Sequence, residues 1–108
     1  MKIPRSVNIL GKSCKIKVRK LVIQPGTAIP VEGYFDPALF EIWVTRNADH
    51  QFMVATLFHE LFHAHCHRVG ITQSPSWTLD LEEVMAESLS NFLAETFTIS
   101  FNSKKKIK

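Results

Sequence analysis

The sequence predicts an α+β protein in which a small, mostly antiparallel sheet of about three strands precedes two long helices. The prediction depends on where two periodic patterns fall: strand-like alternation ends near residue 45, and apolar spacings of three and four residues begin after residue 50. Strands grouped before helices are typical of the α+β class. With 108 residues, of which 45% are hydrophobic, we expect one domain over residues 1–100.

The first two predicted strands are joined by a short turn. Residues 7–10 form the first strand-like run, residues 11–13 contain the turn glycine, and residues 14–23 form the second run. In the second run basic and apolar side chains alternate, which is typical of a strand with one buried face. The alternating basic residues are Lys15, Lys17 and Arg19.

A segment rich in proline and glycine precedes the third predicted strand. Residues 24–37 contain three of the five prolines, so we expect a loop there, with room only for a short strand near Tyr34. Residues 40–45 are aromatic and β-branched, which predicts the third strand. This strand is a candidate edge for pairing with an extended peptide.

Two helices are predicted after residue 49. The first covers residues 50–68, because Asn47 or Asp49 can cap its start and Gly70 is a typical residue after a helix end. The second runs from about residue 79 towards residue 99. We expect both helices to pack on the sheet. The apolar positions of the second helix are Val84, Leu89, Phe92, Leu93 and Phe97.

Charge is distributed unevenly along the chain. Residues 1–20 carry +7, residues 21–103 carry −8 (two basic against ten acidic side chains) and residues 104–108 carry +4, which sums to +3. The basic first segment suits nucleic acid or another acidic partner, but it also suits a solvated strand face, so nucleic acid is an unsupported possibility. We expect the Lys-rich end, residues 101–108, to be disordered.

Several classes of protein are disfavoured by composition. No apolar run approaches the roughly 18 residues of a spanning helix, and the first ten residues lack the apolar stretch of a secretory signal. Two cysteines, Cys14 and Cys66, are too few for a disulfide framework. We therefore expect a cytoplasmic protein with no membrane segment.

The strongest chemical signal is the H-E-x-x-H motif His59-Glu60-Leu61-Phe62-His63, which lies inside the first predicted helix. Residues four apart share a helix face at roughly 5–6 Å between Cβ atoms, so two imidazoles can converge on one zinc ion. Glu60 projects beside that ion, where it can take a proton from a water activated by the metal. His59 and His63 are therefore predicted ligands, and Glu60 is the predicted general base.

Two histidines leave a catalytic zinc site incomplete, since such sites usually have three protein ligands. A metzincin site would need Gly at position 66 and His at position 69, where this chain has Cys66 and Val69. Carboxylates of the second helix remain as candidates. Glu82 is expected to face solvent, whereas Glu87 lies one turn beyond Glu83 and is placed either to bind the ion or to orient a ligand histidine.

A family resemblance narrows this choice. His59-Glu60-x-x-His63, a Gly-terminated helix and the segment Glu83-x-x-Ala86-Glu87-x-Leu89-Ser90-Asn91-Phe92-Leu93-Ala94 together resemble the ImmA/IrrE-like zinc peptidases, especially their short single-domain phage and prophage versions. Ile9-Leu10-Gly11-Lys12 resembles a turn near the start of those proteins. The resemblance implies a gluzincin-type site with His59, His63 and Glu83 as zinc ligands.

The expected function is therefore a zinc metallopeptidase that hydrolyses a protein or peptide substrate, with Glu60 as general base. The main alternative is a non-catalytic binding module, in which the same zinc stabilises the fold and the partner is a protein or DNA. A metal-free interaction protein is the third possibility.

Tyr34, the only tyrosine, has no predicted catalytic role. The triplet His65, Cys66 and His67 is interpreted as a C-terminal helix turn and not as a second metal site.

Overall fold

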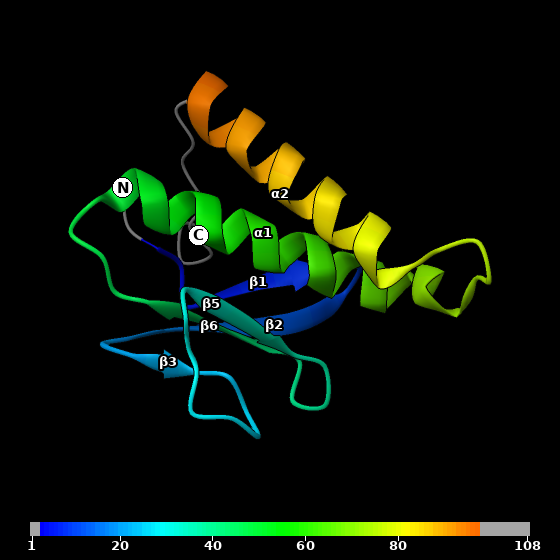
Figure 1. The fold of residues 1–108 in the computed structure, drawn as a ribbon, viewed down its shortest axis with the longest axis horizontal. Helices are drawn as coiled ribbons and strands as arrows, with labels where there is room; N and C mark the ends of the chain where they lie inside the picture. Colours follow the sequence, from blue (N-terminus) through cyan, green and yellow to red (C-terminus); the bar gives the residue numbers. More distant parts are fainter. Residues whose placement is uncertain (1–2, 98–108) are drawn as a thin grey trace, which may run out of the picture.

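Two helices and a mixed sheet make up the α+β fold of the computed structural model, which describes residues 3–97 (Figure 1). The strands are β1 (Ser6–Ile9), β2 (Lys12–Arg19), β3 (Val22–Ile23), β4 (Pro30–Val31), β5 (Gly33–Asp36) and β6 (Glu41–Thr45). The helices are α1 (His50–Val69) and α2 (Leu79–Thr96), with a 3-10 turn at Ile71–Gln73 between them. Within residues 3–97, neither helix combines the length and the hydropathy needed to span a bilayer.

The main sheet has four strands in the order β1-β2-β6-β5. The β1–β2 and β5–β6 pairs are antiparallel, whereas β2 and β6 run parallel, so the sheet is mixed where a mostly antiparallel sheet of three strands was expected. The prediction that the strand at 40–45 lies at an edge of the sheet is wrong, because β6 has β2 on one side and β5 on the other. The edge on that side of the sheet is β5, the short strand expected near Tyr34.

The long strand expected at 14–23 is divided in two. β2 ends at Arg19, which pairs with Thr45, the last residue of β6. Residues beyond that point have no partner in the main sheet. Val22–Ile23 instead pairs with Pro30–Val31 in a separate two-stranded sheet (Figure 1).

Both ends of α1 have the predicted caps. Asp49 accepts hydrogen bonds from the backbone N–H groups of Gln51 (3.0 Å) and Phe52 (3.3 Å). Gly70 adopts the left-handed conformation (φ 79°) that ends many helices, and its N–H donates to the Cys66 carbonyl at 3.2 Å. These caps fix where α1 starts and stops, and thereby the positions of the motif histidines along it.

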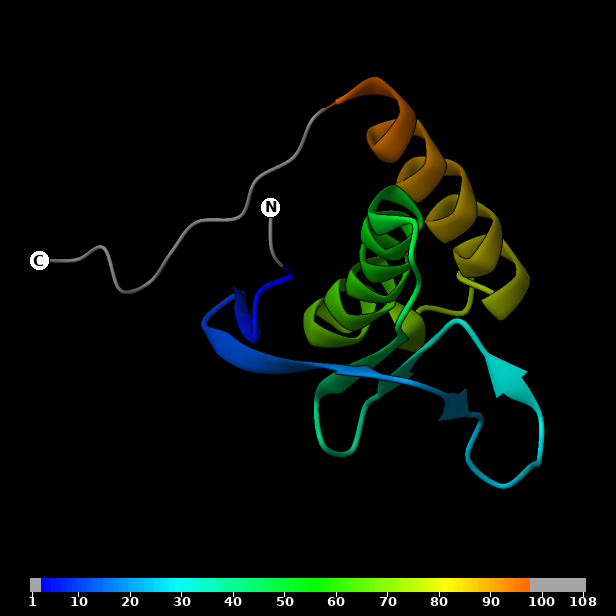
Figure 2. The same ribbon diagram turned by 90° about the vertical axis from the view of Figure 1, so that its left-hand side faces the viewer.

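The core lies between the sheet and α1, and Figure 2 shows α1 above the sheet with α2 beside it. Ile42 and Val44 of β6 and Leu57 of α1 are fully buried. Their burial follows from the repeat of side-chain direction in each element. Alternate residues of a strand face the helix, and every third or fourth residue of the helix faces the strands. Other members of this core are Ile9, Cys14, Ile16, Phe40, Met53 and Ala64.

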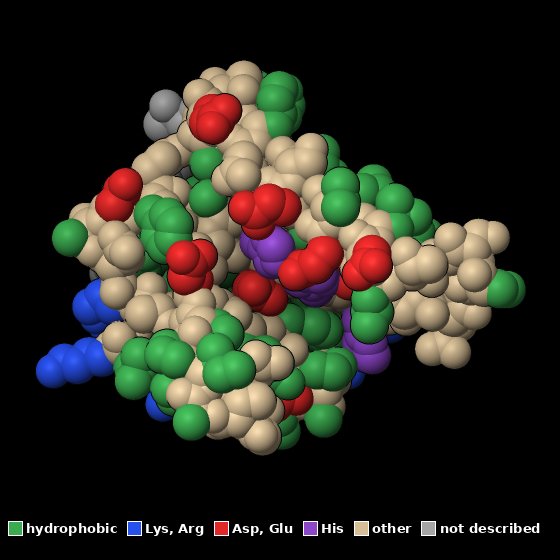
Figure 3. Space-filling model, viewed as in Figure 1, with side chains coloured by type: hydrophobic (Ala, Val, Ile, Leu, Met, Phe, Trp, Pro, Cys, Tyr) green, Lys and Arg blue, Asp and Glu red, His purple; other side chains and the backbone are tan. Residues whose placement is uncertain are grey.

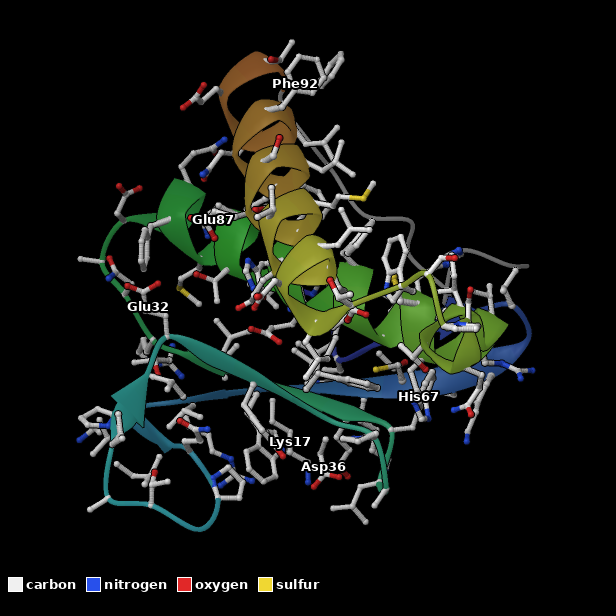
Figure 4. The ribbon with its side chains drawn as sticks, turned by 45° about the vertical axis from the view of Figure 1, so that its right-hand side comes forward. Lys17, Glu32, Asp36, His67, Glu87 and Phe92 are labelled. Atoms are coloured by element: carbon white, nitrogen blue, oxygen red, sulfur yellow. The ribbon has the colours of Figure 1, made fainter. Side chains whose placement is uncertain are left out.

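Helix α2 packs against α1 and not on the sheet as expected. Its buried residues are Glu82, Ala86 and Ser90, whereas the apolar residues Val84 and Phe92 are 66% and 54% exposed. Figure 4 shows Phe92 near the end of α2 that is farthest from the sheet. The buried face of α2 is therefore largely polar, and of the predicted apolar stripe only Leu93 is half-buried, whereas the other four residues are exposed. The helix ends at Thr96, because Phe97 has extended backbone angles (φ −121°, ψ 146°), so the predicted continuation towards residue 99 is wrong. The predicted disordered tail lies outside the described residues.

Burial of Cys14 gives a prediction for its reactivity. Burial, aided by the charge of Glu41, raises the pKa of the Cys14 thiol to about 11. At pH 8 the reactive thiolate should then be on the order of one part in a thousand, in a side chain that solvent does not reach. We expect iodoacetamide to label Cys14 only in urea, as measured by mass spectrometry of tryptic peptides. Labelling of native protein at the rate of a small-molecule thiol would contradict this packing.

Candidate metal centre

His59 and His63 lie one turn apart on the face of α1 that meets α2. Their Nε2 atoms are 3.2 Å apart and their ring centroids 4.9 Å apart. Each imidazole is half-buried, with about a fifth of its side chain exposed. The two nitrogens therefore point at one small volume that solvent and small ions can still reach.

Glu83 of α2 brings a carboxylate oxygen to the same volume. Its Oε1 atom lies 2.8 Å from Nε2 of His59 and 2.7 Å from Nε2 of His63. Ligands at about 2.0–2.1 Å from a tetrahedral zinc ion are roughly 3.3 Å from one another, so the three atoms are close to the spacing that one shared ion requires. His59, His63 and Glu83 form a group that can hold a metal, with all ligand atoms within 4.8 Å.

The opposite edge of each imidazole faces another carboxylate of α2. Nδ1 of His59 lies 3.0 Å from Oε1 of Glu87, and Nδ1 of His63 lies 2.5 Å from Oε2 of Glu82. A carboxylate at Nδ1 favours the tautomer with its proton there, which leaves the Nε2 lone pair free. Two lone pairs then face each other and an oxygen of Glu83, and such a group is stable only with protons or a cation between them.

Glu82 is not the solvent-facing residue that was expected. It is only 5% exposed, and it accepts a hydrogen bond from Nε1 of Trp77 at 2.8 Å in addition to its contact with His63. Neighbouring helix residues point about 100° apart, so Glu82 was expected to turn away from the site when Glu83 faces it. The structure instead places the Glu82 and Glu83 carboxylates on the two ring nitrogens of His63. The Glu87 carboxylate contacts Nδ1 of His59, which is the geometry that its expected orienting role would require.

The charges of this group shift its proton affinities. Burial pulls the pKa of His63 down, but hydrogen bonds to Glu82 and Glu83 outweigh burial, and the pKa is raised overall. For Glu83 burial acts to raise the pKa, but the hydrogen bond with His63 and the nearby imidazoles outweigh it and lower the pKa. The arrangement therefore favours an ionised carboxylate facing positive charge, which is also the state that a cation would stabilise.

Glu60 differs from the other carboxylates of the site. It is 9% exposed, and within the described residues it forms neither a hydrogen bond nor an ion pair. Burial raises its pKa more than the neighbouring His59 and His63 lower it. A mostly buried carboxylate whose pKa is raised and which lies beside two imidazoles is typical of sites where a side chain exchanges a proton.

Gly33 allows β5 to approach Glu60. A Cβ atom at this position would lie 2.7 Å from Cγ2 of Thr56 and 3.1 Å from Cγ of Glu60. Distances this short require the neighbours to move, so only glycine fits here without displacement. The sequence contained a signal for this contact, since glycine within a strand often marks a close backbone approach, but nothing indicated which helix residues would be approached.

Two cavities meet at the histidine cluster. One, of about 240 Å³, is lined by Glu32, Glu60, Glu83 and Glu87, and no Lys or Arg within residues 3–97 lines it. The other, of about 610 Å³, extends past Phe35 and His67 towards Leu79, and it shares Gly33, His59, Glu60 and Glu83 with the first. In Figure 3, acidic side chains surround the histidines in a hollow between the helices and the sheet, and Figure 4 shows Glu32 and Glu87 on opposite sides of it.

The triplet after the motif belongs to the helix end, as expected. Cys66 is buried, and the His67 ring packs edge-on against Phe35 at 5.8 Å between centroids. Among residues 3–97, the group of His59, His63 and Glu83 is the one set of side chains with metal-binding geometry. Tyr34 borders the larger cavity, and its ring stacks at 5.5 Å on Trp43, a residue of the strand next to its own.

Comparison with known proteins adds no assignment. No protein-family model matches the chain, and no curated protein and no solved structure matches it either. The similarity to ImmA/IrrE-like peptidases therefore depends on the motif residues and their spacing. It remains a prediction, and the chemistry of the site has to be argued from its geometry.

The close approach at Gly33 gives a test of how the site is packed. Gly33→Ala should destabilise the protein by about 1–3 kcal/mol, because the added methyl group overlaps Thr56 and Glu60. Adding Thr56→Ser removes Cγ2, the nearest obstructing atom, and should recover part of the lost stability. Urea unfolding of the two single variants and the double variant measures this coupling. A Gly33→Ala protein as stable as the parent, or a double variant whose losses simply add, would contradict the contact.

Proposed function

We propose that this protein is a zinc-dependent peptidase of the H-E-x-x-H type, with His59, His63 and Glu83 as metal ligands. The observation that carries the proposal is the shared contact of Glu83 Oε1 with both Nε2 atoms, at 2.8 and 2.7 Å. Carboxylates at both Nδ1 atoms support it, since histidine ligands of metals commonly donate their second ring N–H to such groups. Two imidazoles and a carboxylate are a donor set that suits zinc.

Glu60 is the proposed general base. A bound zinc ion would supply Lewis acidity, which lowers the pKa of a water and polarises a peptide carbonyl. Glu60 is placed beside the ligand histidines in both cavities, and its raised pKa brings it nearer to the operating pH of a proton acceptor. It takes the proton of the attacking water and then donates it to the departing amine.

The cleft suits an extended peptide. The strand β5 forms the edge of the main sheet, and Gly33 in that strand borders both cavities together with Glu60. An edge strand offers unpaired main-chain groups, to which a peptide can add as a further strand. We therefore propose that the substrate lies along β5 and not along β6. The carboxylates of the smaller cavity favour a basic substrate side chain there.

A zinc-stabilised binding module is the second candidate function, and the same ligands support it. Glu60 argues against this alternative, because a structural site gains nothing from a buried carboxylate without a hydrogen-bond partner. Both cysteines are buried and free, which agrees with a reducing compartment, so we retain the cytoplasm as the proposed location.

Substitution of Glu60 separates the two functions. Glu60→Gln should keep one zinc per chain and the native fold, but it should lose cleavage of a peptide library enriched in Lys and Arg by about 100-fold or more, because the proton acceptor is gone. Glu95→Gln, an exposed change of the same charge, is the matched control and should cleave normally. Wild-type protein that binds zinc but cleaves nothing would favour the binding module, and protein that binds no zinc would refute both.

The zinc affinities of two further variants test which carboxylate is the third metal ligand. Glu83→Ala should weaken zinc binding more than Glu87→Gln does, because Glu83 is a proposed ligand and Glu87 only orients His59. Loss of an orienting carboxylate typically costs about 10- to 100-fold in affinity. Competition with a chromogenic chelator measures the zinc affinity of both variants. The reverse order of effects would make Glu87 the third ligand.

A further inference from the structure

A further cavity lies away from the histidine cluster and has the opposite charge. Its volume is about 830 Å³, and no Asp or Glu is among the lining residues in the described part of the chain. The five basic residues that line it, which we call the basic groove, are Arg5, Lys15, Lys17, Arg19 and Arg46. Figure 4 shows Lys17 on the side of the sheet opposite α1 and α2, away from the acidic cleft.

Strand alternation places the central cations of the groove together. Cys14 and Ile16 of β2 are buried towards α1, so Lys15, Lys17 and Arg19 project from the opposite face. Backbone hydrogen bonds hold the other two nearby: the Arg5 carbonyl accepts from the Ile16 N–H at 2.8 Å, and the Arg46 N–H donates to the Arg19 carbonyl at 2.7 Å. The basic residues that are spread over the sequence thus meet on one surface.

The positive charge of the groove is largely uncompensated. Lys17 pairs with Glu41 at 3.4 Å, but none of the other four cations forms an ion pair with any residue in the range 3–97. Adjacent cations repel each other, and a multivalent anion would remove this cost. The groove therefore has the electrostatic character of a site for a polyanion.

Aromatic rings lie next to these cations on the same face. Trp43 pairs with Lys17 across the parallel strands, and the Arg19 guanidinium lies 6.0 Å from the Trp43 ring centroid. Tyr34 pairs with Trp43 in the next strand, with 5.5 Å between ring centroids. An acidic peptide would use the cations alone. A single-stranded nucleic acid would use both features, with phosphates on the cations and a base on the rings.

We infer that this face of the sheet binds single-stranded nucleic acid, with the phosphate backbone in the basic groove and a base stacked at Trp43. Duplex nucleic acid is a poorer fit, because its bases are already stacked and would not reach the rings. The phosphate-binding part of this face is separate from the proposed peptidase site, because none of the described residues that line the basic groove lines the cavities at the histidine cluster. Tyr34, beside Trp43, also borders the larger of those cavities.

Binding of a fluorescein-labelled oligo(dT) of twelve nucleotides to the full chain, followed by anisotropy, tests the groove. Lys15→Gln combined with Arg46→Gln should weaken binding at least about 10-fold at 50 mM salt and reduce the salt slope by about 1.4, since each phosphate contact on a single strand contributes about 0.7. Lys12→Gln combined with Lys20→Gln removes the same charge outside the groove and should change affinity less than about 3-fold. Equal losses in both double variants would overturn the groove assignment.

Stacking is tested separately with Trp43 as the reporter. In a Trp77→Phe background Trp43 is the only tryptophan, and oligo(dT) should quench its fluorescence. Trp43→Leu should weaken binding about 5-fold or more, because a stacked base contributes about 1–3 kcal/mol. Thermal melts followed by circular dichroism establish that each variant is folded. A poly-glutamate of equal charge that binds as tightly, or oligo(dT) binding without quenching, would show a general anion surface and overturn the inference.

Discussion

Glu83 faces two imidazole nitrogens across the boundary between α1 and α2, and this contact is the centre of a set of polar contacts that join the two helices. The buried side of α2 carries Glu82, Ala86 and Ser90, which offer little apolar area for packing. Polar contacts take the place of apolar packing between the helices. Glu82 contacts His63, and at the other end of α2 the Gln51 side-chain amide donates to the Ala94 carbonyl. Interactions between charged groups are strong in a half-buried site, but only when each charge has a partner. A cation among the two histidines and Glu83 would complete that pairing.

The separation of charge over the molecule follows from its two layers. The acidic residues of α2 and of the segment before β5 meet at the histidine cluster, on the helical side of the sheet. Lys15, Lys17 and Arg19 of β2 alternate with the buried Cys14 and Ile16, so these three cations lie on the opposite side. The acidic cleft would attract cations and basic peptides, while the basic groove would attract polyanions. One small domain thus presents two surfaces of opposite charge.

Local signals predicted much of the fold. The Asp49 and Gly70 caps, the helical position of the H-E-x-x-H motif and the β1–β2 turn each depend on a few neighbouring residues, and the structure contains all of them. The partner of β6 could not be predicted, because alternation along a strand says which residues are buried and not which strand lies beside it. The parallel β2–β6 pair and the edge position of β5 are therefore absent from the prediction.

At the site, too, local patterns could not predict which distant residues lie side by side. Spacing places His59 and His63 on one helix face, and Glu83, which was expected opposite them because of a resemblance, lies beside both. The side of α2 that meets α1 could not be read from its apolar stripe, so the burial of Glu82 and its bond to Trp77 were missed. The approach of Gly33 to Glu60 joins residues 27 apart in sequence, a distance over which no local pattern acts.

X-ray absorption spectroscopy at the zinc edge of the zinc-loaded protein tests the central claim most directly. The proposed site predicts one zinc per chain with only nitrogen and oxygen neighbours at about 2.0–2.1 Å and the scattering pattern of two imidazoles. Substitution of Glu83 by alanine should remove one oxygen neighbour or abolish binding. A sulfur neighbour at about 2.3 Å would place the metal at a cysteine, and that result would contradict a site made of His59, His63 and Glu83.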